Sequence, residues 1–203
     1  MNERSRFPRL WWGRLRYLIS LRRLSPRVAR FLWKAWRHAT RTGDRFSLDS
    51  AVRPGQLAVL VALARGRRRI VELGTGTGWT AIALALDDST REVASYDPVV
   101  RPEREVYLAM VSDTVRDRVE LRNEEDVSGP RPGEAAEVLF IDSSHDRESV
   151  LAAFRAWRAA LTPDAVVAFH DYGHPEYPGV RDAILELGLV GAETNGIFVW
   201  EAP

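Results

Sequence analysis

The feature that most constrains the fold of this chain is a stretch at residues 71–80 in which three glycines stand at alternate positions. Gly74, Gly76 and Gly78 follow an apolar run at 69–73 and precede residues 79–86, which have the composition of a buried helix. Glycine is needed where φ is positive or where a ligand lies against bare backbone, and the start of a helix offers unpaired N–H groups. The stretch therefore predicts a strand, a cofactor-binding turn and a helix.

The spacing of the glycines separates several classes of nucleotide-binding loop. A dinucleotide-binding loop has the pattern Gly-x-Gly-x-x-Gly, which these alternating glycines do not complete. A P-loop has a lysine and a Ser or Thr after its last glycine, whereas this chain has Trp79 and Thr80 there. The remaining pattern, Glu-Leu-Gly-x-Gly-x-Gly at residues 72–78, resembles the first motif of class I S-adenosylmethionine-dependent methyltransferases. Their loop accommodates the methionine end of the cofactor.

The acid after the next predicted strand is a second sign of a nucleoside site. Residues 92–96 read as a strand, and Asp97 stands 19 residues beyond Gly78. The order strand, helix, strand implies parallel pairing through a right-handed crossover. A carboxylate at the end of this strand can accept both hydrogens of a ribose diol. We predict that Asp97 binds the ribose of the cofactor; the alternative is a helix cap before Pro98.

The alternation of strands and helices continues to the end of the chain. Further strands are predicted at 118–122, 136–141, 165–169, 189–190 and 196–200, with helices at 54–64, 106–111, 148–161 and 179–188 between or before them. This order predicts an α/β fold with a Rossmann-like, doubly wound, seven-stranded sheet and an N-terminal helical extension. We divide the chain into a basic arm at 1–45 and a catalytic domain at 46–203.

Polar residues are expected to collect at one edge of this sheet. Ligands of open α/β sheets bind outside the carboxyl ends of the strands. The residues predicted to share this rim are Glu72, Asp97, Asp142, His170 and Asp171.

Residues from about 50 to 200 resemble class I O-methyltransferases of the group containing macrocin O-methyltransferase and similar antibiotic- and sugar-methylating enzymes. Catechol O-methyltransferase is a more distant relative. The features that carry the resemblance are residues 72–78, Asp97, the block Phe140-Ile141-Asp142-Ser143-Ser144-His145, and Phe169-His170-Asp171 followed by Gly179-Val180.

This resemblance implies a role for each residue of the site. S-adenosylmethionine would be bound by Glu72, Gly74, Thr75, Gly76, Gly78, Asp97 and Asp142. Asp142, His170 and Asp171 would hold a divalent metal, and His145 would be the catalytic base. Mg²⁺ prefers oxygen ligands, so the imidazole of His170 would shift the preference from Mg²⁺ towards Mn²⁺, Fe²⁺, Co²⁺ or Zn²⁺. The alternative is that His170 is structural and no metal is bound.

The predicted function is transfer of a methyl group to a hydroxyl of a small molecule, such as a sugar or a natural product. One alternative is RNA or nucleoside methylation, with the basic arm as a tether. The chain lacks the Asn/Asp-Pro-Pro-Tyr tetrad typical of amino-group methylation and has His170-Asp171-Tyr172-Gly173 instead. Another alternative is a non-catalytic, membrane-associated protein that keeps the fold.

The arm differs sharply in charge from the rest of the chain. Residues 1–45 contain 13 Lys and Arg against two acids, whereas the remainder contains 16 Lys and Arg against 26 acids. A basic amphipathic helix is predicted within 1–24, and a second helix between Ser25-Pro26 and Gly43. Its apolar face would comprise Val28, Phe31, Leu32, Ala35, Trp36 and Ala39. The arm could pack on the domain or in a homo-oligomer, contact an anionic membrane through residues 1–24, or, least favoured, bind nucleic acid.

Composition adds an expected location. The chain of 203 residues contains no cysteine, which excludes disulfides and thiolate metal ligands and favours the cytoplasm. No apolar run reaches the roughly 20 residues of a membrane span, and no signal peptide is recognised.

Overall fold

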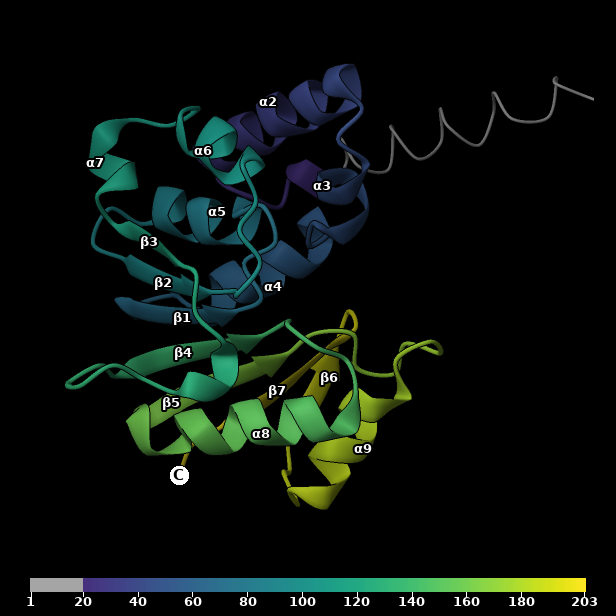
Figure 1. The fold of residues 1–203 in the computed structure, drawn as a ribbon. Coiled ribbons are helices and arrows are strands. Elements are labelled where there is room, and N and C mark those ends of the chain that lie inside the picture. The colour runs from purple at the N-terminus through teal and green to yellow at the C-terminus, as the bar shows by residue number, and fades with distance from the viewer. Residues whose placement is uncertain (1–19) are drawn as a thin grey trace, which may run out of the picture.

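The computed structural model describes residues 20–203 and shows a seven-stranded sheet between two layers of helices (Figure 1). The strands are β1 (Arg69–Leu73), β2 (Glu92–Tyr96), β3 (Val119–Arg122), β4 (Ala136–Ile141), β5 (Leu161–Phe169), β6 (Ala192–Thr194) and β7 (Ile197–Glu201). They lie in the order β3-β2-β1-β4-β5-β7-β6, with β1 to β5 parallel and β7 antiparallel to β5 and β6. The strand order reverses between β1 and β4, which confirms the predicted doubly wound sheet.

Helices cover both faces of the sheet. They are α2 (Pro26–Thr42), α3 (Arg45–Ser50), α4 (Pro54–Leu63), α5 (Trp79–Asp87), α6 (Glu103–Leu108), α7 (Asp113–Arg116), α8 (Arg147–Trp157) and α9 (Pro178–Glu186), with the 3₁₀ turns η2 (Asp126–Ser128) and η3 (Arg158–Ala160). One core cluster joins α2, α4 and α5 to the sheet, and the other joins α8 and α9 to its opposite face (Figure 1). Within residues 20–203, no helix is long and apolar enough to cross a membrane.

Helix α2 forms where the sequence predicts it and packs by its apolar side. Pro26 occupies the first turn, and Gly43 ends the helix in the left-handed conformation with φ of 75°. Ser25 stands at the N-cap, but its hydroxyl makes no capping hydrogen bond. The side chains buried in the core are Val28, Phe31, Leu32, Ala35 and Ala39. The helix predicted within residues 1–24 lies largely outside the described residues, and the domain division at residue 45 stays a prediction.

Several predicted boundaries are wrong for local reasons. Helix α3 was not predicted; it begins because the Asp44 carboxylate accepts the backbone N–H of Ser47 at 3.0 Å. The helix expected at 106–111 ends at Leu108. Strand β5 begins at Leu161, four residues early, because a register shift against β4 accommodates Thr-Pro-Asp within the strand. The strand expected at 189–190 lies at 192–194 instead, since Leu189 N–H still bonds to the Ile184 carbonyl of α9.

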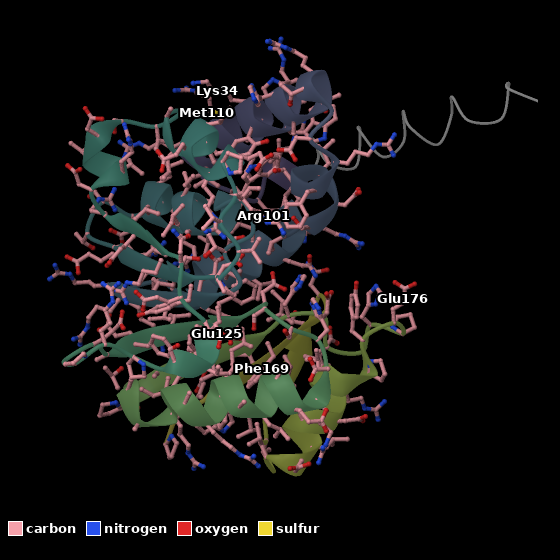
Figure 2. The ribbon with its side chains drawn as sticks, viewed as in Figure 1. Lys34, Arg101, Met110, Glu125, Phe169 and Glu176 are labelled. Atoms are coloured by element: carbon pink, nitrogen blue, oxygen red, sulfur yellow. The ribbon has the colours of Figure 1, made fainter. Side chains whose placement is uncertain are left out.

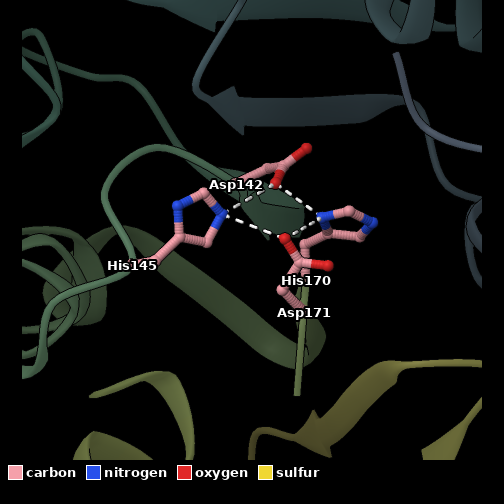
Figure 3. A group of neighbouring side chains, drawn as sticks. All are labelled: Asp142, His145, His170 and Asp171. Carbon is pink, nitrogen blue, oxygen red and sulfur yellow. Dashed lines mark ion pairs between the residues drawn. The ribbon is translucent and has the colours of Figure 1, made fainter. Parts of the chain in front are cut away.

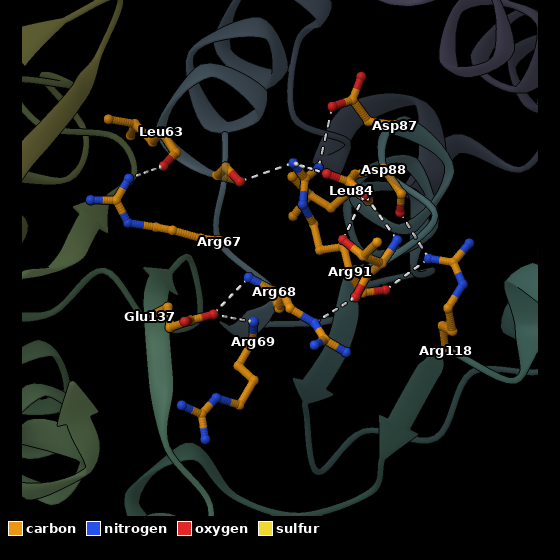
Figure 4. A network of polar contacts seen from close by, with 12 residues as sticks. Leu63, Arg67, Arg68, Arg69, Leu84, Asp87, Asp88, Arg91, Arg118 and Glu137 are labelled. Carbon is orange, nitrogen blue, oxygen red and sulfur yellow. Dashed lines mark hydrogen bonds and ion pairs between the residues drawn. The ribbon is translucent and has the colours of Figure 1, made fainter.

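Arginine and acidic side chains fix the amino edge of the sheet (Figure 4). Glu137 of β4 accepts the backbone N–H groups of Arg68 and Arg69 at 2.6 and 2.7 Å. Arg91, which is 1% exposed, donates to the carbonyls of Leu84 and Ala64, each at 2.9 Å. These contacts close the edge opposite the predicted rim.

Candidate active site

The glycine-rich turn is built from left-handed backbone pressed against the loop after β4. Gly74, Gly76 and Gly78 have φ values of 103°, 51° and 85°. A Cβ at Gly74 would lie 2.2 Å from the carbonyl oxygen of Asp142. Only glycine fits this contact, because any side chain would keep the turn after β1 from lying so close to the start of the loop after β4.

A single cavity of about 1000 Å³ lies along the carboxyl edge of the sheet. Most of the predicted site residues line it, namely Gly74, Thr75, Gly76, Asp97, Asp142, His145, His170 and Asp171. Gly78 does not; it starts α5. Glu72 also stays out of the lining and lies buried in β1.

Asp97 is held by the glycine-rich turn and by a buried arginine. Its carboxylate accepts the N–H of Gly76 at 3.0 Å and that of Val99 at 2.9 Å. Arg104, which is 4% exposed, pairs with it at 2.9 Å. The same guanidinium donates to the Gly76 carbonyl and to Asn123 Oδ1, each at 2.9 Å. Arg104 was not predicted, because nothing in the residues around it marks an arginine that folds back onto the turn.

Glu72 supports the turn from within the sheet. Ser95 of β2 donates to its carboxylate at 2.5 Å, and the Ser95 hydroxyl is 2.7 Å from that of Thr75. Burial raises the pKa of Glu72 to about 8, with a smaller contribution from the charge of Asp142. Burial thus favours the neutral acid of Glu72, and its hydrogen bond with Ser95 links it to Thr75 of the turn.

Two acids and two histidines meet at the other end of the cavity (Figure 3). His170 Nδ1 is 2.7 Å from Asp142 Oδ1, and His145 Nε2 is 3.2 Å from Asp171 Oδ2. One potential ligand atom from each of the four residues lies within 4.8 Å of the others. The structure thus gathers the three predicted metal ligands and places the predicted base, His145, directly beside them.

The charges of this cluster shift each other's protonation. Although burial favours the neutral imidazole, the negative charges of Asp142 and Asp171 raise the pKa of His170 to about 10. Against the effect of burial, contacts with His145 and His170 lower the pKa of Asp171. Asp171 has φ of 54°, a left-handed conformation that Asp tolerates better than most residues. The cluster therefore combines opposite charges with a constrained backbone.

The donor set fits a divalent transition metal. Within residues 20–203, neither His145 Nε2 nor the two ring nitrogens of His170 have a hydrogen-bond partner of good geometry, although these atoms are buried. Imidazole and carboxylate together suit Zn, Mn, Fe or Co better than Mg, which prefers oxygen alone. Two carboxylates would neutralise the charge of such an ion.

Further residues of the wall were missed from the sequence. Tyr177 stacks between His145 and His174, with ring centroids 4.1 and 4.7 Å apart. Across the cavity, the Arg101 guanidinium carbon lies 3.5 Å from the ring centroid of Phe46, on α3. Asp44, directly after Gly43, is a residue type that commonly caps the start of a helix, so α3 could have been predicted from the sequence. No local pattern marks the stack around Tyr177.

A family model described as a methyltransferase domain matches residues 71–172. The chain belongs to this methyltransferase family. The match spans the glycine-rich turn, Asp97 and the whole His/Asp cluster, and it confirms the predicted enzyme class. No curated protein matches the chain.

Solved structures share the fold. The O-methyltransferase TomG from Streptomyces achromogenes, in complex with S-adenosylmethionine, is 23% identical, covers 83% of this chain and 90% of its own, and has a TM-score of 0.63. The O-methyltransferase from Bacillus cereus, in complex with S-adenosylhomocysteine, is 18% identical, covers 85% and 90%, and has a TM-score of 0.64. CalS11, a TDP-rhamnose 3'-O-methyltransferase, is 20% identical, covers 71% and 78%, and has a TM-score of 0.57. These likenesses confirm the Rossmann-like architecture.

Proposed function

We propose that this methyltransferase uses S-adenosylmethionine to methylate a hydroxyl group of a small molecule such as a sugar or a natural product. The observation that carries the proposal is the single cavity, which has the glycine-rich turn and Asp97 at one end and the His/Asp cluster at the other. Methyl transfer to oxygen requires one part of the site to bind the nucleoside cofactor and another part to remove the hydroxyl proton of the acceptor. The names of TomG and CalS11, an O-methyltransferase and a sugar O-methyltransferase, agree with this choice.

The cofactor would lie across β1 and β2. We assign the ribose hydroxyls to Asp97, whose oxygens keep lone pairs free beyond the contacts with Gly76 and Arg104. The bare backbone of Gly74 and Gly76 would contact the methionine end, beside the hydroxyl of Thr75. This orientation directs the sulfonium methyl along the cavity towards the acceptor, as an in-line displacement demands.

At the acceptor end, His145 would act as the base. The acceptor oxygen forms a bond to the methyl carbon while the carbon–sulfur bond breaks, and S-adenosylhomocysteine leaves. The hydroxyl proton would pass to the imidazole of His145. The carboxylate of Asp171, 3.2 Å from His145 Nε2, would stabilise the imidazolium that forms.

Asp142, His170 and Asp171 would hold a divalent ion next to this base. When bound, such an ion acts as a Lewis acid that lowers the pKa of the acceptor hydroxyl. The imidazole of His170 favours a first-row transition metal over Mg²⁺.

The alternatives have less support. RNA or nucleoside methylation is not favoured by any contact of the cavity, and the tetrad of amino-group methylation is absent from the sequence. A non-catalytic protein would have no need for four convergent ionisable groups in a cavity. Homo-oligomerisation and a cytoplasmic location stay predictions.

The test is methyl transfer from labelled S-adenosylmethionine to a panel of sugars, sugar nucleotides and phenols, with and without a chelator. We expect one acceptor class to be methylated on oxygen. Chelation should abolish turnover, and Mn²⁺, Fe²⁺, Co²⁺ or Zn²⁺ should restore it better than Mg²⁺. Turnover that survives exhaustive chelation would contradict the metal role, and labelled nitrogen in the product would contradict the hydroxyl acceptor.

A further inference from the structure

The outward face of α2 carries a continuous stripe of positive charge. Residues 27, 30, 34, 37 and 41 are all Arg or Lys, at alternating steps of three and four that place them on one side of the helix. All five are exposed, as are Arg22 and Arg23 just before the helix. The opposite side of α2 is buried in the core, so the helix presents only this face to solvent.

The basic side chains of this stripe are not neutralised by the fold. Residues 20–43 contain no Asp or Glu. In the part of the chain from residue 20 onward, no ion pair includes a basic side chain of this stripe. Among the contacts of residues 20–203, Lys34 is the one member of the stripe with a polar side-chain contact, to the carbonyl of Met110 at 3.4 Å (Figure 2). A charge of one sign along the face of a 17-residue helix attracts an extended anionic surface.

Aromatic rings accompany the charge. Trp33 and Trp36 stack with centroids 5.3 Å apart, and Trp33 is 37% exposed. Tryptophan beside Lys and Arg is typical of helices that lie in a membrane interface, where the ring enters the headgroup region. Trp36 packs partly against the core, which leaves Trp33 as the exposed ring. Duplex nucleic acid would also attract the charges but offers no apolar layer for this indole, so the ring favours lipid.

We propose that the exposed face of α2, from Arg27 to Arg41 with Trp33, docks on an anionic lipid bilayer. The lining of the cavity begins at Phe46 and includes no residue of α2, so substitutions on the exposed face of α2 do not alter the cofactor site. Docking and cofactor binding are therefore separable, and the inference does not depend on the proposed reaction.

The experiment is co-sedimentation of the full chain with vesicles of phosphatidylcholine alone and of phosphatidylcholine with phosphatidylserine. The test variant combines Arg30→Gln, Arg37→Gln and Arg41→Gln, and leaves Lys34 in its contact. A matched control combines Arg65→Gln, Arg158→Gln and Arg181→Gln, three exposed arginines on other surfaces. Glutamine keeps helix propensity, and circular dichroism verifies folding of each variant.

The wild-type chain should sediment with the serine-containing vesicles and not with phosphatidylcholine alone, and added salt should release it. Each charge near the bilayer contributes roughly fivefold to partitioning, so the α2 variant should bind about one hundredfold more weakly and the control within about twofold of wild type. Trp33→Ser should weaken vesicle binding further. Equal binding by the α2 variant and the control would overturn the proposal. So would wild-type binding to duplex DNA or RNA that exceeds vesicle binding at the same salt concentration.

Discussion

At the cofactor end of the cavity, three contacts from the chain hold the Asp97 carboxylate in place, whereas at the acceptor end four ionisable groups face one another without a complete set of hydrogen bonds. Asp97 is held by Gly76, Val99 and Arg104. His170, by contrast, has no hydrogen-bond partner of good geometry for either ring nitrogen within residues 20–203. The fold thus fixes the orientation of Asp97 at the first end, and a bound ion or substrate would supply partners at the second.

This difference indicates how each end contributes to catalysis. A preorganised end binds its ligand with little rearrangement, so substitutions there should act on affinity. At the acceptor end, the buried polar groups would gain partners only when an ion or substrate binds, so substitutions there should act on the rate of methyl transfer. Substitutions at the two ends therefore test the comparison directly.

The largest effect is expected from Asp142→Asn. This change keeps the shape of the side chain but removes a charged ligand from the cluster, where it lies 2.7 Å from His170. Loss of several kcal/mol of charge stabilisation should lower kcat about a thousandfold or more and weaken metal binding. Steady-state kinetics and metal titration measure both. Asp164→Asn, at an exposed position away from the cavity, is the matched control and should leave both unchanged.

Substitution of His145 by glutamine should come next. Removal of a general base typically lowers kcat by 10²–10⁴, and cofactor affinity should stay within about twofold of wild type. Single-turnover kinetics and S-adenosylhomocysteine titration separate the two quantities. An unchanged pH profile with unaltered kcat would show that His145 is not the base.

Asp97→Asn should act on the opposite end. Hydrogen bonds to a charged group contribute about 1.5–3 kcal/mol, so cofactor affinity should fall roughly ten- to a hundredfold. The value of kcat at saturating cofactor should change little. A large drop in kcat with normal affinity would break the distinction between the two ends.

Arg104→Lys probes the support behind Asp97. Lysine keeps the charge but cannot donate to Gly76 and Asn123 while it also pairs with Asp97. We expect cofactor affinity to fall by about five- to tenfold, less than for Asp97→Asn. Arg104→Met, which also removes the charge, should weaken cofactor affinity further than Arg104→Lys does. This ranking of the two variants is the internal control.

The smallest effect is a pH dependence of stability. Asp142 and Asp171 raise the pKa of His170 from 6.5 to about 10 in the metal-free protein. A raised histidine pKa stabilises fully below pH 6.5, and this contribution is lost as pH rises through about 10. Tm of the chelated protein should therefore decline across that window, and His170→Gln should flatten the decline. A bound metal requires neutral imidazole and should flatten it as well; His174→Gln should not.

The sequence predicted the strands and the site from features that act locally. The alternating glycines, the acids at strand ends and the pair His170-Asp171 can each be recognised from the residues next to them in the chain. Because parallel strands bring their carboxyl ends to one edge of a sheet, a shared site at that edge could be expected. Arg104 and Tyr177 could not, because their roles arise from contacts across loops far apart in the chain. Strand β5 and the closing strand β6 were misplaced since a bulge and a helix end depend on neighbouring elements.

The most direct test is calorimetric titration of the folded, metal-free chain with S-adenosylhomocysteine. Binding should have one site per chain, should weaken in Asp97→Asn and should persist in His145→Gln. If wild-type protein with a normal circular dichroism spectrum takes up none of this molecule, the cavity does not hold the proposed cofactor and the assignment of its two ends is wrong.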